Sequence, residues 1–192
     1  VYRVSRQLFS TDAVTQMTGR DATDDASNGH RHDSDIVNAI SRLELRGYMT
    51  NTLLRDTDAM SMAHSLEVRV PLVDVKVVQF ALSLPGKWKL ANNGVAKPLL
   101  ADAVADLLPR DLLARPKMGF TLPFEKWMQG RLRAEIASVL EDGGRVGETG
   151  LAAIAVRDVW QRFLRKPRAV GWSRPWSLYA LARWCEINGV TP

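Results

Sequence analysis

Charged side chains that could carry chemistry are concentrated in three short segments in the middle of the chain. The first segment, Leu53 to Asp74, reads LLRDTDAMSMAHSLEVRVPLVD. Glu67 and Arg69 are two residues apart on what we expect to be an extended piece, so their side chains point to one face. Such a face can orient an acidic substrate, or the charges can form a buried ion-pair network that fixes the turn at Pro71. The ionisable side chains that we select from this segment are Asp58, Glu67, Arg69 and Asp74.

The other two segments carry basic residues. Lys97 follows Gly94 in NGVAKPLL, at the expected start of a helix, where a lysine opposes the helix dipole. An ammonium group and a helix N-terminus together can hold phosphate oxygens, although an exposed lysine is more commonly only solvated. Arg115 and Lys117 stand in ARPKMGF, beside a glycine that permits a tight bend. This pair can contact phosphate or pair with acids at the surface.

Several self-sufficient chemistries have no signature in this chain. It has no Gly-rich phosphate loop of the Walker type, no G-x-G-x-x-G after a strand and no C-x-x-C. The single cysteine, Cys185, excludes an internal disulfide framework and is expected to be a small core residue. His30 and His32 lie near Asp33 and Asp35, but this spacing alone is a weak metal signal, so we predict no metal site formed by side chains.

The charge and hydropathy patterns restrict the partners. The formal net charge is +5, and seven basic residues against one acid lie between Arg157 and Arg183. A solvated basic face explains this stretch, and nucleic-acid binding is the sharper alternative, although no zinc-finger, RRM or KH signature supports it. No apolar run approaches the ~20 residues of a membrane span. A reducing, cytoplasmic location is therefore the expectation.

The periodicity predicts many helices and almost no strand, so the chain by itself is expected to be mainly α. We expect residues 1–33 to form an N-terminal arm and a mobile loop, and residues 34–192 to form a helical core without an internal domain boundary. Ser10 or Thr11 is expected to cap the first helix and Ser34 the next. The principal helices are expected at residues 11–17, 36–43, 53–65, 73–84, 97–108, 110–114, 132–140, 156–164 and 176–187. Ser173 is expected to cap the last helix, which is apolar nearly all round and should be buried. Asn188-Gly189 is expected to end this helix with a left-handed cap.

The three segments together resemble the C-terminal half of the synthetase domain of glutamine-dependent asparagine synthetases. The family has a segment much like Met60 to Asp74, then a G-x-x-K-like segment that matches Gly94 to Leu100, then an RPK-x-GF-like segment that matches Arg115 to Phe120. Order and spacing both match, and the likeness is good from Leu43 to Gln129. The first motif is long and specific, whereas each of the other two is weak alone.

The resemblance implies an enzyme that uses ATP to adenylate the side chain of aspartate, releasing pyrophosphate, before ammonia from glutamine displaces AMP. It assigns the main catalytic role to Lys97, whose charge stabilises the developing negative charge. Glu67, Arg69, Asp74 and Asp58 would shape the site, and Arg115 and Lys117 would contact phosphates. Mg²⁺ would bridge the phosphates, held by carboxylates or by the nucleotide.

Other parts of that enzyme have no counterpart in these 192 residues. The family's SGG-x-DS pyrophosphate loop, its GEG-x-DE-like segment and its glutaminase cysteine are absent here, and all three precede the matched region in the family. We therefore expect the chain to be inactive alone, to flank a parallel sheet in a larger α/β fold, and to expose apolar surface through which it could form a homodimer. The alternatives are an amidotransferase or cyclase acting on another carboxylate, or a non-catalytic helical interaction domain.

Overall fold

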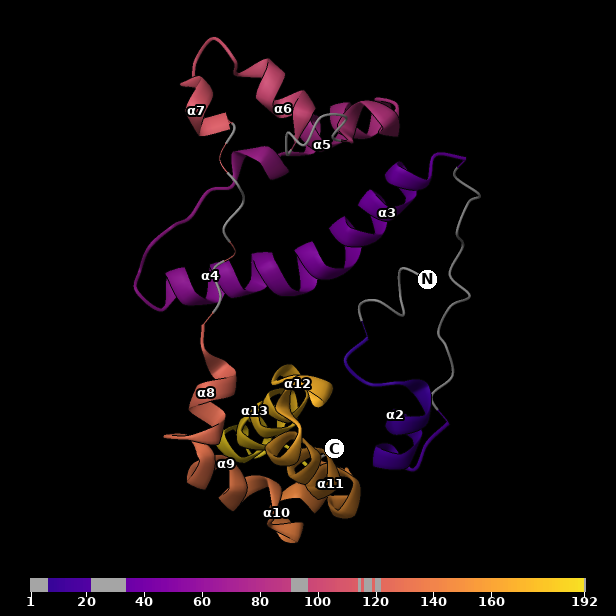
Figure 1. The fold of residues 1–192 in the computed structure, drawn as a ribbon, viewed down its shortest axis with the longest axis vertical. Coiled ribbons are helices and arrows are strands. Elements are labelled where there is room, and N and C mark those ends of the chain that lie inside the picture. Colours follow the sequence, from indigo (N-terminus) through magenta and orange to yellow (C-terminus); the bar gives the residue numbers. More distant parts are fainter. Residues whose placement is uncertain are drawn as a thin grey trace. The chain divides into compact units, whose positions relative to one another are not determined.

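A computed structural model describes residues 7–21, 34–90, 97–113, 115, 119 and 122–191 (Figure 1). Every regular element in these ranges is a helix, which confirms the prediction of a mainly α chain. Contacts divide the chain into two units, one made of Val1–Asn28 with Phe120–Pro192 and the other of Gly29–Gly119. We call them the terminal unit and the middle unit. The arm and core boundaries predicted from the sequence stay a prediction.

The terminal unit is a helical cluster around one apolar core. The completely buried Trp160 and Phe163 stack with their ring centroids 5.7 Å apart, and buried residues from five other helices close around them. The unit therefore holds its own hydrophobic core. Its helices are α2 (Thr11–Thr18), α8 (Phe124–Gln129), α9 (Arg133–Leu140), α10 (Gly143–Gly147), α11 (Ala153–Arg165), α12 (Pro167–Val170) and α13 (Ser173–Asn188).

Helix α2 packs on this cluster although more than a hundred residues of sequence separate them. Its buried Met17 joins the core, and the Met17 carbonyl accepts a hydrogen bond of 2.7 Å from the Ala152 amide at the start of α11. The Ser10 hydroxyl accepts a hydrogen bond from the Ala13 amide, so the prediction of an N-cap at Ser10 is confirmed. The left-handed Gly19 ends the helix.

Helix α13 is buried on one side only. The prediction of burial all round is wrong, because Trp184 and Ile187 are 54% and 71% exposed. Ser173 is the first helical residue and not the cap, since Trp172 holds the N-cap position without a side-chain hydrogen bond. Gly189 ends the helix in the left-handed conformation, as predicted. The residues on the buried side are Pro175, Leu178, Tyr179, Ala182 and Cys185.

The middle unit is built on one long helical rod, which Figure 1 shows running through α3 and α4. We expected two helices here, but the backbone continues from α3 (Ile36–Glu44) through the π-helix η1 (Leu45–Leu54) into α4 (Arg55–Met62). The Thr50 hydroxyl donates to the Leu45 carbonyl, five residues back, which follows the wider π spacing. After the rod come η2 (Pro71–Val73), α5 (Val75–Ser83), η3 (Gly86–Lys89), α6 (Pro98–Ala103) and α7 (Arg110–Leu113).

A polar junction joins the start of the rod to η3. The cap of α3 is Asp35 and not Ser34, because the Asp35 carboxylate accepts hydrogen bonds from two amides of the first turn. The same carboxylate accepts a 2.6 Å hydrogen bond from the Gly86 amide. Buried Asn38 donates to the Leu84 carbonyl and accepts from the Lys89 ammonium. The pKa of Asp35 is lowered from its usual value by the hydrogen bonds that its carboxylate accepts, chiefly from the Gly86 backbone amide and then from the Asn38 backbone amide.

Within its described residues, the middle unit has no apolar core of its own. Ala101 is the single apolar side chain there that is buried. Large apolar side chains are exposed instead, along the rod, along the connector that follows it (residues 63–70), on η2, α5 and η3, and after α6. They include Ile36, Met60, Met62, Leu66, Val68, Leu72, Val75, Phe80, Trp88 and Leu107. The expectation of exposed apolar surface is therefore confirmed, and it falls mainly in this unit.

Candidate functional site

The residues predicted for the site all belong to the middle unit by sequence position. The structure describes Asp58, Glu67, Arg69, Asp74, Lys97 and Arg115, and each of them is exposed. Lys117 lies outside the described residues. The exposure of the six means that solvent or a partner can reach every one of them.

Glu67 and Arg69 are brought together, as their spacing predicts. The Arg69 Nε donates to Glu67 Oε1 at 3.0 Å, and a second guanidinium nitrogen lies 2.9 Å from the same oxygen. Both side chains are exposed, so the alternative of a buried ion-pair network is wrong for this pair. An exposed pair contributes little to stability, which leaves both groups available for contacts with another molecule.

Asp74 and Asp58 have different local roles. The Asp74 carboxylate accepts a 2.8 Å hydrogen bond from the Lys76 amide and caps α5, so this carboxylate already has a structural function. Asp58 lies in the first turn of α4, and its backbone carbonyl accepts a hydrogen bond from the Ser61 hydroxyl. The hydrogen bonds and ion pairs of the described chain do not link Asp58 or Asp74 to the Glu67–Arg69 pair.

Lys97 occupies the N-cap position of α6, at the helix start where the sequence predicts it. Its backbone is left-handed, with φ 57° and ψ 57°, immediately before Pro98. A proline disfavours the right-handed helical conformation in the residue before it, and the left-handed region that Lys97 adopts instead is uncommon for residues other than glycine. Helix α6 ends at Ala103, short of the predicted Leu108, and turns follow. The Lys97 ammonium has no ion-pair partner in the part of the chain that the structure describes.

Arg115 is already paired. Its guanidinium lies 3.3 Å from the carboxylate of Asp111, and both side chains are exposed. A phosphate contact would therefore compete with a weak surface ion pair. As for a metal centre, no group of three or more His, Cys, Asp or Glu side chains that could hold an ion occurs among the residues described. His30 and His32 lie outside them.

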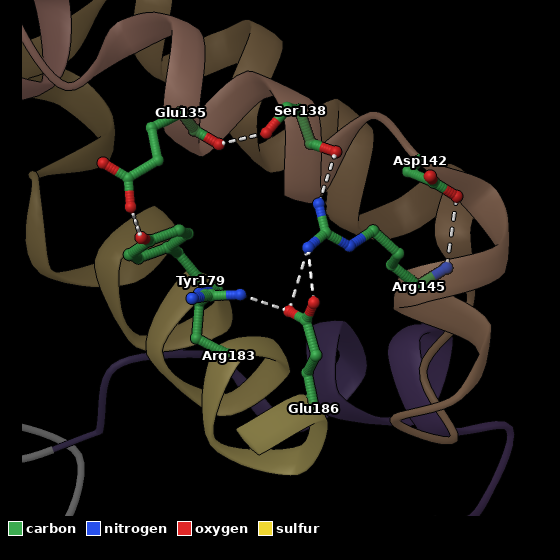
Figure 2. A network of polar contacts seen from close by, with 7 residues as sticks. All are labelled: Glu135, Ser138, Asp142, Arg145, Tyr179, Arg183 and Glu186. Carbon is green, nitrogen blue, oxygen red and sulfur yellow. Dashed lines mark hydrogen bonds and ion pairs between the residues drawn. The ribbon is translucent and has the colours of Figure 1, made fainter.

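The terminal unit holds a polar network that the sequence did not reveal (Figure 2). Arg145 on α10 donates to both carboxylate oxygens of Glu186 on α13, at 2.7 and 2.9 Å, and Arg183 contacts the same carboxylate. These donors, Arg145 first, lower the pKa of Glu186. On the same side of α13, next to Arg183, the Tyr179 hydroxyl donates to Glu135 on α9. Burial, and then this bond, raise the pKa of Tyr179.

This network is structural. It joins residues that are 41 and 44 positions apart, so no local spacing announces it. A hollow of about 260 Å³ beside it is lined by Arg145, Cys185 and Glu186 among others. This volume is below the ~300 Å³ at which ligand sites begin, and the Arg145 guanidinium inside it is already occupied.

The basic stretch from Arg157 to Arg183 is similarly engaged within the terminal unit. Arg157 donates to the Glu141 carbonyl at 2.6 Å, and Arg174 donates to the carbonyls of Leu8 and Val170. Arg162 forms an i,i+4 ion pair with Asp158 at 2.8 Å. Arginines that bridge helices and cap carbonyls explain part of the positive charge of this stretch without an anionic partner.

Comparison with known proteins places this helical chain in a family. The family model for asparagine synthase matches residues 2–186, nearly the whole chain. The fold and the sequence thus define a member of a ligase family, and this chain belongs to the asparagine synthase family. No solved structure matches it. Within its described residues, no helix is long and apolar enough to cross a membrane.

Curated relatives agree with this assignment. Asparagine synthetase [glutamine-hydrolyzing] 1 of Bacillus subtilis (strain 168) is 31% identical over 106 residues, which is 55% of this chain and 17% of the relative. The asparagine synthetases [glutamine-hydrolyzing] of Gallus gallus and Homo sapiens are each 32% identical, over 130 and 129 residues, which is 63% of this chain and 23% of each relative. The chain therefore spans less than a quarter of the length of these relatives.

Proposed function

We propose that this chain is the C-terminal part of the synthetase domain of a glutamine-hydrolysing asparagine synthetase. In the complete enzyme an aspartate side-chain carboxylate attacks the α-phosphorus of ATP and releases pyrophosphate. Ammonia derived from glutamine then attacks the acyl-adenylate, and AMP leaves as asparagine forms. The observation that carries this proposal is the family match over residues 2–186, which includes every predicted site residue.

The properties of Lys97 support a role in charge stabilisation. Both steps place negative charge on oxygens, first on the phosphoryl group and then on the acyl oxygen. A fixed cation stabilises such charge best where water is excluded. The Lys97 ammonium is exposed and unpaired among the described residues, so it is available for this purpose once the rest of the domain covers it.

The other candidates would position the substrates. In this proposal the exposed Glu67–Arg69 pair orients aspartate, since each partner can exchange its surface ion pair for a substrate group. Asp58 and Asp74 shape the same wall, Asp74 by fixing the start of α5. Arg115 and Lys117 contact phosphate oxygens. For this contact Arg115 gives up its surface ion pair with Asp111.

ATP and Mg²⁺ would be bound mainly by parts of the enzyme beyond these residues. The described residues offer no carboxylate cluster for an ion, so we propose that the nucleotide phosphates, and not this chain, hold Mg²⁺. Upstream segments would supply the pyrophosphate loop and the glutaminase, and would lie against the exposed apolar side chains of the middle unit. We accordingly propose that the isolated chain is inactive.

The test uses the full-length parent enzyme with ATP, Mg²⁺, aspartate and ammonia, and measures AMP and pyrophosphate. Lys97→Ala should lower the aspartate-dependent rate by about 10²- to 10³-fold. The matched control is Lys87→Ala, which removes another exposed lysine of the middle unit and should leave the rate unchanged.

Each alternative outcome has a definite meaning. Release with a different carboxylate but not with aspartate would favour an amidotransferase or cyclase. No release with any carboxylate would favour a non-catalytic interaction domain. An undiminished rate in Lys97→Ala would refute the role of Lys97, and aspartate-dependent AMP production by the isolated chain would refute its proposed inactivity.

A further inference from the structure

A small polar network fixes the position of η3 in the middle unit. Asn38 on α3 is buried, and its Oδ1 accepts a hydrogen bond from the Lys89 ammonium at the end of η3. The same ammonium donates to the Ala81 carbonyl on α5 at 2.7 Å. Asn38 Nδ2 donates to Asp35 Oδ2 at 3.3 Å and to the Leu84 carbonyl at 3.1 Å. The start of the rod, the end of α5 and η3 therefore meet at these side chains.

Hydrogen bonds, and not apolar packing, hold η3 at this position. The described middle unit has no apolar core that could press η3 against the rod. Hydrogen bonds are directional, so a buried network whose groups find partners specifies one arrangement of the elements that carry them. Lys89 is half-buried, whereas Lys87 on the same short helix is exposed. Loss of the Lys89 ammonium would take a donor away from both Asn38 Oδ1 and the Ala81 carbonyl.

The position of η3 determines the position of Lys97. η3 contacts both α3 and α6, and α6 contacts no other described element as extensively as η3. Ala101 on α6 is buried, and its amide donates a 3.0 Å hydrogen bond to the Lys97 carbonyl. On its other side the Lys97 carbonyl carbon is bonded to Pro98, whose ring fixes the backbone. A displacement of η3 would therefore displace α6 and the Cα atom of Lys97.

We propose that Asp35, Asn38 and Lys89 are positioning residues for Lys97. They fix η3 against the rod, and η3 fixes the helix whose N-cap is Lys97. This inference rests on the proposed catalytic role of Lys97 and adds the part of the fold that sets its position. Catalytic groups must lie within about 0.5 Å of their productive position, and a misplacement of 1 Å by a distant change can cost about 10²-fold in rate. The three positioning side chains themselves touch no substrate in this proposal.

Lys89→Met in the full-length parent enzyme tests the proposal. This change keeps the length of the side chain and removes its hydrogen-bond donors. The kcat of aspartate-dependent AMP release should fall about 10- to 100-fold. The KM values for ATP and aspartate should stay within about twofold, because the lost interaction acts on the transition state. The matched control is Lys87→Met, which removes the exposed lysine of η3 and should leave kcat and KM unchanged.

A double-mutant cycle with Lys97→Ala separates positioning from a general loss of stability. If Lys89 acts through Lys97, Lys89→Met should lower the rate of the Lys97→Ala enzyme by no more than about threefold, since the group that it positions is already absent. A change that only destabilised the enzyme would lower the rate equally in both backgrounds.

Asp35→Asn is a second variant that attacks the same network from the rod. Asparagine is as good an N-cap as aspartate, so α3 keeps its cap. Its amide nitrogen, however, stands where the Gly86 amide and Asn38 Nδ2 both need an acceptor. The same fall in kcat is expected, and again little further effect in the Lys97→Ala background.

Hydrogen exchange in α6 gives a readout that does not depend on activity. The amides of residues 99–103 should exchange about tenfold faster in Lys89→Met and in Asp35→Asn than in the unmodified enzyme, because α6 loses its fixed support. Their exchange should be unchanged in Lys87→Met. Far-UV circular dichroism of each variant shows that its helices are retained.

Three results would overturn the proposal: an unchanged kcat in Lys89→Met, an equal fall in rate with and without Lys97, or unchanged exchange in α6. An undiminished rate in the Lys97→Ala single variant is a failure of the proposed function, and the inference falls with it. Where that single variant is impaired, the three results concern the positioning residues alone, so the two failures are distinguishable.

Discussion

Gly86→Ala should loosen the junction between the rod and η3. A Cβ atom at Gly86 would lie 2.2 Å from Asp35 Oδ1 and 2.5 Å from Val37 Cβ, in place of an ordinary contact of 3.4–4 Å. Val37 Cβ is attached directly to the backbone of α3, so this clash cannot be relieved by a side-chain rotation. We expect η3 to move away by about 1 Å and to weaken the hydrogen bond from Gly86 to Asp35, as an overpacked contact does.

The size of the effect follows from the cost of overpacking, about 1–3 kcal/mol. Hydrogen exchange read out on residues 36–44 reports the local opening of α3, and this cost corresponds to exchange that is about 5- to 150-fold faster. Gly47→Ala is the matched control. No atom would lie within 4 Å of its Cβ, and alanine favours helix over glycine by about 1 kcal/mol. Exchange in Gly47→Ala should be unchanged or slower.

The same substitution has a consequence for pH. The hydrogen bond from Gly86 is the largest cause of the lowered pKa of Asp35, so this pKa should rise in Gly86→Ala. A lowered carboxyl pKa stabilises the fold above the unfolded pKa, and this stability is lost as the pH falls through the folded pKa. The variant should therefore lose less stability on acidification. Exchange within about twofold of the unmodified chain, or an equal effect of Gly47→Ala, would refute the reasoning.

Four further substitutions probe the terminal unit. Phe163→Ala should lower the free energy of unfolding by about 3–5 kcal/mol in urea titrations. Trp160→Phe should lower it by only about 1–2 kcal/mol, because this change also removes a buried indole N–H that has no partner among the described residues. Glu186→Gln should flatten the loss of stability below pH 4.5, since the ion pairs that lower the Glu186 pKa disappear as this carboxylate protonates; an unchanged acid limb would contradict this. Tyr179→Phe should cost about 1 kcal/mol through its lost bond to Glu135, and a cost near zero would show that water replaces that bond.

Local signals in the sequence predicted local structure well. Ser10 and Gly189 mark helix ends because capping depends on the nearest few residues, and Cys185 was correctly expected in the core. The two mistaken caps, Ser34 and Ser173, differ. At α3 serine and aspartate compete for the N-cap, and Asp35 is also held by Gly86, which lies 51 residues away. No short window of sequence contains that contact. At α13 the N-cap residue is Trp172, which makes no side-chain capping bond.

Interactions between distant segments were beyond prediction for the same physical reason. The packing of α2 on α11 and the Arg145–Glu186 pair depend on which surfaces meet after folding. The wrong prediction that α13 is buried on all sides has another cause. An apolar side chain indicates a buried position only if the surface that would cover it is present. Of the predicted site, the contact between Glu67 and Arg69 could be read from their spacing. The position of Lys97 at a helix start could be read from the helical periodicity that begins at this residue.

The distribution of apolar residues connects the fold to the proposed function. The terminal unit buries Trp160, Phe163 and their neighbours, so it holds what a folded domain requires. The middle unit exposes its apolar side chains along the rod and the connector, and it carries all the candidate site residues. A surface that covers those apolar side chains would also exclude water around Lys97 and Glu67, which is the condition under which fixed charges stabilise a transition state most. Covering the apolar side chains of the middle unit and excluding water from the site would then occur together. A change that uncovers these side chains should therefore lower the activity of the enzyme and, at the same time, the protection of the middle unit from hydrogen exchange.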